Sequence, residues 1–452
     1  MKSHDVIVVG CGTGGAIASK VCSMANLDVV AVDAKDYSHI GTKVCGDAVT
    51  GIYFEILKDI DLKEPNGTEL TQTINGLKLF GHKKKHCLTI ENEENNGYML
   101  NRYEFGQRLL RDTVNSGTKV YDNSKVIDVL TKNNTVEGVI ILNKKTGEQK
   151  EIYSKIVIDA GGYTAPVRSR VPFDTPGLEK KIDKRDIENC YREIRDYSLH
   201  DSYLQLYVDI EVAPGGYMWL FPKGEHVNLG VGIQGSSQVN PKKVYEKFIS
   251  SFEFINESKL LSKGGGVVPV RHPIDSLVSN GLMLVGDAAS QVNPMHGGGI
   301  GFSMRGGYYA AKVAIESIKN KSWDINALWK YNVIYMKDMG AKQASLEVLK
   351  LLLQTLSNNE IDFIFRKKIF TAEELMSAVK DGTFKISFFD KVKRLLISLR
   401  HISMLKKLTK IGKLMKSAMK IYQTYPEQVG SFENWKKEQS VIFEEVYDLC
   451  CD

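Results

Sequence analysis

The stretch that decides the fold is "DVIVVGCGTGGAIASK", residues 5–20, near the start of the chain. Its apolar run predicts a buried strand, and Gly10, Gly12 and Gly15 follow as G-x-G-x-x-G directly before a helix. Glycines at these positions permit a tight turn, close approach of the backbone to a pyrophosphate and close packing of helix on strand. A second strand ends at Asp33, where a carboxylate can accept hydrogen bonds from an adenosine ribose. This order of elements predicts a Rossmann-like domain that binds a dinucleotide.

Length and composition limit which classes of protein this chain can belong to. A chain of 452 residues is larger than one hydrophobic core usually supports, so we expect two or three domains. Its seven cysteines are odd in number, scattered and without paired metal-ligand spacing, which indicates a reduced, cytoplasmic setting and no metal centre. No run of sequence approaches the ~18 apolar residues that a membrane-spanning helix requires. Any contact with a membrane should therefore be peripheral.

Positive charge is concentrated in residues 385–420. This segment holds eleven Lys or Arg against one acidic residue, whereas the whole chain has a net charge of +6, so the remainder is net negative. Apolar residues alternate with the basic ones at helical spacing, which suits a helix lying on anionic lipid headgroups. A solvated helix packed on its own domain explains the pattern equally well. Nucleic acid is not an expected partner, because no recognition motif accompanies the charge.

A second glycine-rich stretch, residues 281–317, decides which dinucleotide binds. It reads "GLMLVGDAASQVNPMHGGGIGFSMRGGYYAAKVAIES": a short strand leads to Asp287, Pro294 follows, and a long helix begins near Ile300. This arrangement resembles the second FAD motif of the para-hydroxybenzoate hydroxylase superfamily. The resemblance implies that Asp287 holds the ribityl chain of FAD and that the backbone of Gly298–Ile300 faces the pyrimidine side of the flavin. A helix N-terminus aimed there stabilises the negative charge of a reduced flavin.

Two further segments agree with this superfamily, and one tempting motif does not. Arg102 opens a predicted helix and matches an arginine that the superfamily uses near the flavin and its phosphates. Residues 154–171 resemble its D-G-x-x-S-x-x-R segment, although Ala165 replaces the serine, which weakens any prediction of nicotinamide contacts there. The second G-x-G-x-x-G, residues 230–235, is rejected as a dinucleotide site because the next helix is predicted only near Pro241. We interpret its glycines as thinning a strand so that the flavin or a ligand can approach.

A cysteine loop and an aromatic strip carry the most specific resemblance. Cys45–Ala48 reads C-G-D-A and comes shortly after the first strand pair. Residues 214–222, "PGGYMWLFP", place Tyr217, Trp219 and Phe221 on one face of a strand, either in a core or on a cavity wall. Both motifs resemble those of archaeal geranylgeranyl reductases, and the similarity extends over essentially the whole chain. That resemblance implies an FAD-dependent enzyme that saturates the isoprenoid chains of archaeal ether lipids.

The resemblance also implies roles for particular side chains. An isolated alkene has no carbonyl to accept hydride, so a proton must reach one carbon as hydride reaches the other, and aromatic faces would stabilise the developing positive charge. Cys45 is the candidate catalytic residue, as proton source or relay, with an equal alternative in which it only packs against the flavin or sets backbone geometry. The expected substrate-binding residues are Tyr217, Trp219, Phe221 and His296. The expected FAD-binding residues are Gly10, Gly12, Gly14, Gly15, Asp33, Cys45, Gly46, Ala48, Arg102, Val126, Asp287, Pro294, Gly298, Gly299 and Ile300.

The predicted fold class is α/β, with three parts. A Rossmann-like FAD-binding domain of the para-hydroxybenzoate hydroxylase type is expected to be discontinuous, covering residues 1–60, 100–172 and 268–325. Residues 61–99 and 173–267 should form an antiparallel-sheet substrate domain that roofs the flavin. Residues 326–452 should form a C-terminal helical domain that closes the tunnel.

The electron donor and two other functions stay open. No dedicated nicotinamide domain is visible, so electrons should come from a transiently docked nicotinamide or a ferredoxin-like protein. The substrate should be a geranylgeranyl lipid or diphosphate. A flavin monooxygenase of the same fold would consume oxygen, and the aromatic strip and cysteine loop argue against it. A non-catalytic prenyl-lipid carrier would be colourless, and the intact Asp33 and Asp287 motifs argue against that.

Overall fold

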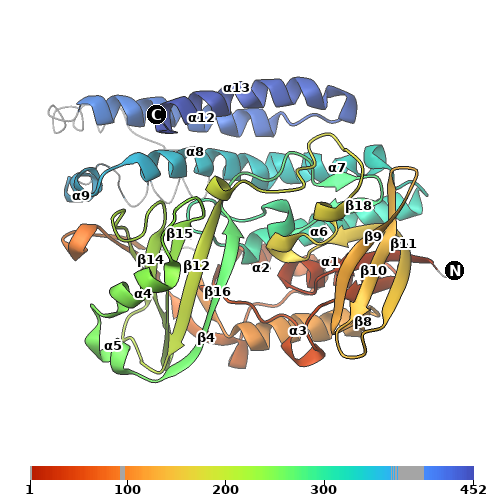
Figure 1. Cartoon of the computed structure of the whole chain (residues 1–452), viewed down its shortest axis with the longest axis horizontal. Coiled ribbons are helices and arrows are strands. Elements are labelled where there is room, and N and C mark those ends of the chain that lie inside the picture. The colour runs from red at the N-terminus through yellow and green to blue at the C-terminus, as the bar shows by residue number, and fades with distance from the viewer. Residues whose placement is uncertain are drawn as a thin grey trace.

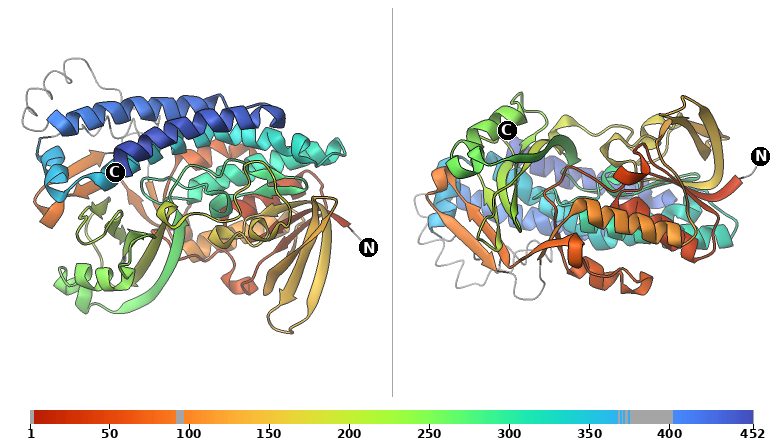
Figure 2. Two further views of the ribbon diagram at one scale, coloured as in Figure 1. Left: turned by 45° about the horizontal axis from the view of Figure 1, so that its top comes forward. Right: turned by 90° about the horizontal axis from the view of Figure 1, so that it is seen from below.

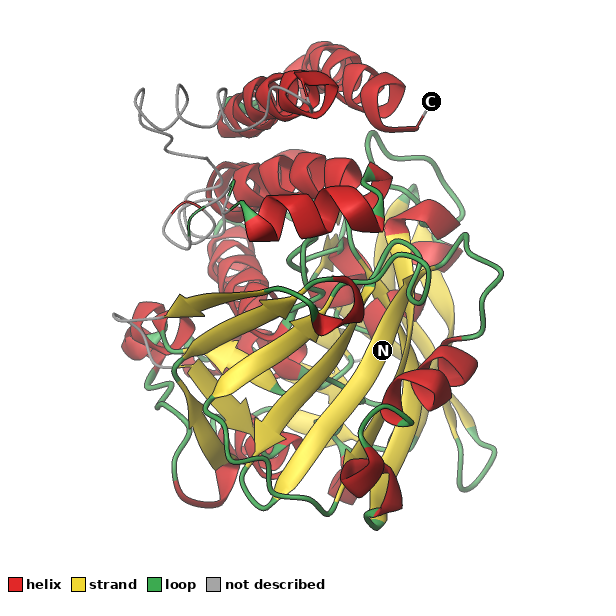
Figure 3. Cartoon of the chain, turned by 90° about the vertical axis from the view of Figure 1, so that its left-hand side faces the viewer, coloured by secondary structure: helices red, strands yellow, loops and turns green. Residues whose placement is uncertain are grey.

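The structure is a computed structural model that describes residues 3–91, 97–367, 369, 371, 374 and 402–451. Two sheets lie next to each other beneath a layer of long helices (Figure 1). This layer contains α8 (Ala341–Thr355), α12 (Ile402–Gln423) and α13 (Phe432–Cys451). Figures 2 and 3 show from other sides that these helices stack on one side of the sheets.

The first sheet is the Rossmann-like one. Its described strands are β1 (Ser3–Val9), β2 (Val29–Val32), β8 (Lys119–Tyr121), β9 (Ser124–Lys132), β10 (Thr135–Asn143), β11 (Gln149–Asp159), β17 (Val278–Ser279) and β18 (Leu282–Leu284). They run in the order β17-β18-β11-β1-β2-β8, and β10 joins β11 to β9. Strands β18, β11, β1, β2 and β8 pair in parallel, as a doubly wound dinucleotide fold requires, whereas β9, β10 and β17 pair antiparallel.

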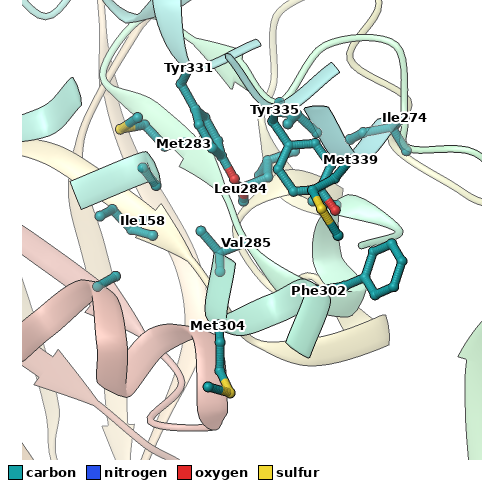
Figure 4. Close-up of a cluster of buried hydrophobic side chains, with 14 of the residues drawn as sticks. Ile158, Ile274, Met283, Leu284, Val285, Phe302, Met304, Tyr331, Tyr335 and Met339 are labelled. Atoms are coloured by element: carbon teal, nitrogen blue, oxygen red, sulfur yellow. Dashed lines mark hydrogen bonds between the residues drawn. The ribbon is translucent and has the colours of Figure 1, made fainter. Parts of the chain in front are cut away.

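Helices beside this sheet complete its core. They are α1 (Thr13–Met24), α3 (Arg102–Asn115), α6 (Ile300–Lys319) and α7 (Ile325–Tyr335). Helix α1 packs on α3 and α6, and α3 begins where the Asn101 side chain accepts hydrogen bonds from the Tyr103 and Glu104 amides. Figure 4 shows the buried cluster between α6, α7 and β18, where the Tyr331 hydroxyl donates to the Leu284 carbonyl at 2.8 Å.

The second sheet is almost wholly antiparallel. Its order is β16-β12-β15-β14-β13-β5-β6, and only β13 and β5 pair in parallel among its described strands. Their bounds are β5 (Gly76–Phe80), β6 (Cys87–Glu91), β12 (Ile187–Arg195), β13 (Tyr203–Tyr207), β14 (Tyr217–Lys223), β15 (His226–Gln234) and β16 (Leu260–Pro269). One face carries Met218, Leu220 and Leu229 against α4 (Pro241–Ile249) and α5 (Glu253–Glu257). The alternate residues of β14 therefore point away from these helices.

Short elements connect the two sheets. A small sheet has the order β3 (Ala48–Thr50), β7 (Gly97–Leu100), β4 (Leu70–Ile74), and α2 (Ile52–Ile56) follows β3. A π-helical turn, η9 (Met336–Gly340), joins α7 to α8, and η8 (Gly286–Ala289) follows β18. Helix α9 (Asn358–Arg366) begins with a capping box between Ser357 and Glu360.

The basic segment lies only partly within the described residues. Residues 385–401 fall outside them, and α12 carries the remainder. Helix α12 packs on α8 through buried apolar residues such as Ile411 and Met415, and Lys410 pairs with Glu445 of α13 at 3.1 Å. This packing supports the alternative of a helix on its own domain for that part, and attraction to lipid headgroups stays a prediction. Within the described ranges no helix combines the length and apolarity that crossing a bilayer demands.

Candidate active site

A cavity of 1560 Å³ runs between the two sheets and beneath α8 and α9. Its lining begins at Gly12 and Asp33, passes the aromatic strip of β14 and reaches Ile361 and Phe365 of α9. Pockets for one small ligand usually measure about 300–1,000 Å³. The volume therefore suffices for a dinucleotide and a second, elongated ligand.

The turn between β1 and α1 forms a cradle for a pyrophosphate. Gly10 has φ +92°, and a Cβ at Gly15 would lie 1.9 Å from the Gly10 carbonyl oxygen, so both glycines are needed for the turn and the helix packing. A Cβ at Gly12 would meet no described atom within 4 Å, because this residue borders the cavity. The N-terminus of α1 thus borders the cavity, where an anion can bind.

Arg102 supplies positive charge to the same cradle. It is the first residue of α3, and its Nη2 donates to the Thr13 hydroxyl at 3.4 Å. Its Nε and Nη1 are buried and have no hydrogen-bond partner among the described residues. Unpaired guanidinium donors beside a helix N-terminus fit the phosphates of a dinucleotide.

Asp33 is held at the end of β2 by two backbone amides. Its Oδ2 accepts from the Cys11 amide at 2.9 Å, and its Oδ1 accepts from the Lys35 amide at 2.8 Å. Both oxygens keep lone pairs for further donors, and the residue lines the cavity. The geometry fits a carboxylate that receives ribose hydroxyls.

The start of α6 forms the other end of the flavin region. Asp287 of η8 forms an ion pair with Lys43, and the distance from Lys43 Nζ to Asp287 Oδ2 is 2.6 Å. Sequence reasoning missed Lys43, although it stands two residues before Cys45. His296 is exposed to the cavity, and the surrounding protein lowers its pKa, so the ring that precedes the helix is neutral at pH 7. Pro294 is buried but does not line the cavity.

The cysteine loop is fastened to the second sheet through Asn228. The Asn228 amide donates to the Cys45 carbonyl at 2.9 Å and to Asp47 Oδ2 at 3.0 Å, and its Oδ1 accepts from Trp219 Nε1 at 3.0 Å. Asp47 is 2% exposed, has φ +66° and also pairs with Lys223 at 2.8 Å. This network ties the backbone around Cys45 to strands β14 and β15.

The aromatic strip joins the cysteine loop to the start of α6. Tyr217, Trp219 and Phe221 all line the cavity, with adjacent ring centroids 6.1 and 6.2 Å apart. At one end a Cβ at Gly46 would touch the Phe221 ring at 3.1 Å, and at the other the Tyr217 hydroxyl donates to the His296 carbonyl at 2.7 Å. Four residue steps along a strand span about 13 Å, so the strip is long enough to run beside a whole flavin ring system.

Gly230 and Gly232 make room for side chains of the same sheet. A Cβ at Gly230 would lie 2.2 Å from Trp219 Cζ2, and one at Gly232 would lie 2.6 Å from Glu188 Oε2. We interpreted these glycines as making room for a flavin or a ligand. That interpretation was wrong, because side chains of the protein itself occupy the space. Strand β15 has glycines here because the side chains of Trp219 and Glu188 lie across it.

The face of the second sheet that lines the cavity is apolar at one end and polar at the other. Toward β6 the cavity lining is aliphatic, with Leu204 and Leu206 on β13, Leu77 and Leu79 on β5, and Leu88 and Ile90 on β6. Toward β16 it is polar, with Glu188, Cys190 and Arg192 on alternate positions of β12.

Arg192 places an unpaired positive charge at the polar end. It is 8% exposed, its Nη1 donates to the Ser262 hydroxyl at 2.7 Å, and its buried Nε has no partner. No ion pair with a described carboxylate engages it. Sequence reasoning did not find Arg192 or Glu188, because both faces of β12 carry polar residues.

Most of the predicted site residues meet in this one cavity. Pro294 is the exception, and the predicted residues that line the cavity are Gly10, Gly12, Gly14, Gly15, Asp33, Cys45, Gly46, Ala48, Arg102, Val126, Tyr217, Trp219, Phe221, Asp287, His296, Gly298, Gly299 and Ile300. Their individual roles stay predictions.

A Rossmann-like cradle, an aspartate at the second strand and a glycine-led helix facing one cavity define the class of FAD-dependent oxidoreductases. Residues 5–167 match the family model described as FAD dependent oxidoreductase, and residues 186–268 match the geranylgeranyl reductase catalytic domain. FAD, predicted from the two motifs, is thereby confirmed as the cofactor.

The chain belongs to the digeranylgeranylglycerophospholipid reductase family. It is 35% identical to the reductase of that name from Sulfolobus acidocaldarius over 449 residues, 98% of each chain. It is also 30% identical to the reductase of that name from Methanothrix thermoacetophila, over 79% of this chain and 89% of the relative.

Solved structures confirm the predicted fold class. A geranylgeranyl bacteriochlorophyll reductase-like protein from Thermoplasma acidophilum aligns with a TM-score of 0.76 at 24% identity, covering 91% of this chain and all of the other. A flavin-dependent brominase aligns with a TM-score of 0.62 at 17% identity, covering 81% of this chain and 93% of the other. At these identities the likeness concerns the fold alone. The predicted domain boundaries stay a prediction.

Proposed function

We propose that this protein saturates carbon–carbon double bonds of geranylgeranyl chains in the synthesis of archaeal membrane lipids, using FAD. One observation carries the proposal: the FAD cradle and the aromatic strip of β14 share a single cavity that continues along an aliphatic sheet face. The names of the relatives from Sulfolobus acidocaldarius and Methanothrix thermoacetophila support it.

The cavity suits a long isoprenoid substrate with a phosphate-bearing head. Strands β12 to β6 are five steps apart, which spans about 24 Å at the usual strand spacing and is comparable to an extended geranylgeranyl chain. The aliphatic residues of β13, β5 and β6 would bind the chain through buried apolar area, at about 25 cal/mol per Å². Arg192 at the polar end would bind the phosphate of a diphosphate or a glycerophospholipid.

The residues around the strip would orient and protect the reacting alkene. When bound and reduced, FAD supplies the hydride. The faces of Tyr217 and Trp219 would stabilise positive charge on the more substituted carbon. Residues of helices α8 and α9 line the cavity and would shield the reacting groups from water. Cys45 is held by Asn228 near Phe221 and remains the predicted proton source or relay.

The physiological setting is part of the proposal. A transiently docked nicotinamide or a ferredoxin-like protein would supply electrons, since the sequence predicts no dedicated nicotinamide domain. The protein would be cytoplasmic and would meet the membrane peripherally through the basic segment of residues 385–420.

The decisive experiment is mass spectrometry of geranylgeranyl lipids and of geranylgeranyl diphosphate incubated with the purified protein and dithionite. The expected result is a mass gain of two hydrogens for each double bond reduced. No gain with any prenyl lipid would refute the proposal. Oxygen consumption would then favour the monooxygenase, and a colourless protein that cannot be reconstituted with FAD would favour the carrier.

A further inference from the structure

We propose that Glu188 is a second catalytic residue, which as a neutral carboxylic acid donates the proton to the substrate alkene. This inference rests on the proposed function. It concerns the end of the aromatic strip opposite Cys45, so the two candidate donors can be tested against each other.

The register of the sheet places the Glu188 carboxyl group over the cavity. Glu188 and Cys190 alternate along β12, and Cys190 pairs with Gly232 of β15, which in turn pairs with Tyr217 of β14. Because a Cβ at Gly232 would lie 2.6 Å from Glu188 Oε2, the carboxyl group leans across β15 toward Tyr217. Its other strand partner is Val268 of β16, which also lines the cavity. The acid therefore borders the space beside the strip.

Glu188 differs from the other described carboxylates that line the cavity. Asp33 accepts from two backbone amides, Asp47 pairs with Lys223, and Asp287 pairs with Lys43. Glu188 is 5% exposed, and its carboxyl group makes no hydrogen bond or ion pair with a described residue. A buried carboxylate without a partner is costly, so burial favours the neutral acid in this position.

The surrounding groups allow Glu188 to hold and release a proton near neutral pH. Burial raises its pKa to about 7, against the opposing influence of Lys350 on α8. Lys350 is itself buried and donates to the Val270 carbonyl at 2.5 Å. Burial also raises the pKa of Tyr217 and of Cys190 far above neutrality, so neither facing group is as good a proton donor. Acids with a pKa near the working pH are the effective general acids.

The step balances without a further reactant. One alkene carbon receives a hydride, with its electron pair, from the reduced cofactor. The other carbon takes the proton of the Glu188 carboxyl group, so that the π bond, the O–H bond and the bond that held the hydride break while two C–H bonds form. Glu188 is left as a carboxylate, which regains a proton from water between turnovers. Tyr217 and Trp219, which line the same cavity, would stabilise the carbon that carries positive charge during the transfer.

The test compares Glu188→Gln, Glu188→Asp and Cys45→Ala in the FAD-loaded enzyme reduced with dithionite. Glu193→Gln is the matched control, because Glu193 lies on the same strand with its carboxylate bonded to Tyr245 and Arg195 away from the cavity. We expect Glu188→Gln to lower the saturation rate at least about 100-fold with normal FAD content. Glu188→Asp should recover part of the rate, and the fall in wild-type rate above pH 7 should be absent in Glu188→Gln.

A readout without turnover completes the test. The wild-type holoenzyme should lose stability as pH rises from about 4.3 to 7, because the folded state holds the Glu188 proton more tightly than the unfolded state does. Glu188→Gln should lack this loss. A Glu188→Gln rate within threefold of wild type, or an unchanged pH profile, would overturn the inference and leave the proposed function intact. An inactive wild-type enzyme would instead refute the proposed function.

Discussion

The side-chain amide of Asn228 donates a hydrogen bond to the backbone carbonyl of Cys45 across 2.9 Å, which joins strand β15 to the cofactor loop. Residues 183 positions apart in the chain thus meet at one fully buried side chain, which is 0% exposed. The same amide binds Asp47 and accepts from Trp219, so the aromatic strip and the cysteine loop share one anchor.

Replacing Asn228 with alanine should loosen this anchor. The Trp219 N–H and the Cys45 carbonyl would each lose a partner in a buried setting, at a cost of about 3 kcal/mol in the free energy of unfolding. Urea unfolding of wild type, Asn228→Ala and the exposed control Asn326→Ala would measure it. A loss below about 0.5 kcal/mol in Asn228→Ala would show that the network does not hold the loop.

Substitutions at two glycines of the first G-x-G-x-x-G motif should impair different properties of the protein. Gly12→Val leaves the packing intact but projects a side chain into the pyrophosphate cradle, so the protein should fold and bind FAD at least tenfold more weakly. Gly15→Ala places a Cβ against the Gly10 carbonyl, so the folded state itself should be destabilised. Fluorescence titration with FAD and thermal unfolding would separate the two effects. Equal FAD affinity in Gly12→Val would mean that the pyrophosphate binds elsewhere.

The indole of Trp219 should contribute to the transition state more than to binding. Cation–π stabilisation of a desolvated carbocation is worth about 1–2 kcal/mol, so Trp219→Leu should lower kcat about tenfold. Trp219→Phe, which keeps an aromatic face but loses the hydrogen bond to Asn228, should lose less. Steady-state rates under dithionite would decide, and a larger loss in Trp219→Phe would mean that the hydrogen bond matters more than the aromatic face.

Arg192 should discriminate substrates by their headgroup. A charge-assisted hydrogen bond to phosphate is worth about 1.5–3 kcal/mol, so Arg192→Gln should raise KM for geranylgeranyl diphosphate at least tenfold. The KM for geranylgeraniol, which lacks phosphate, should stay unchanged. Comparing the diphosphate with a digeranylgeranyl glycerophospholipid would show which headgroup the residue prefers. An equal rise for the alcohol would indicate a general packing defect.

The buried pair of Glu347 and His272 should make stability depend on acidity. Burial opposes ionisation of Glu347, but His272, Lys350 and Arg271 more than offset it and lower its pKa to about 2. The unfolded value is about 4.3, so this contribution is complete above about pH 4.3 and is lost as pH falls toward 2. Denaturant unfolding between pH 3 and 7 would measure this effect. As pH falls, Glu347→Gln should lose less free energy of unfolding than wild type. If the free energies of unfolding of the two proteins fall in parallel with pH, other groups cause the loss of stability in acid.

The local pattern of the sequence was enough to predict the FAD cradle and the position of the aromatic strip. A strand, three spaced glycines and a helix form a continuous unit, so adjacent residues carry all its geometry. The alternation of residues 217–221 likewise decides which side chains share a face, because the period of a strand is two. Recognition of the C-G-D-A loop then linked these units to one family.

Tertiary structure alone decided which groups face the cavity. Both faces of β12 carry polar residues, so only its register with β15 and β16 shows that Glu188 and Arg192 face the cavity, whereas Glu193 faces α4. The Lys43 to Asp287 ion pair joins residues 244 positions apart, and the space at Gly230 is taken by Trp219. Such contacts arise when separate strands and loops pack together, so no local pattern in the sequence encodes them.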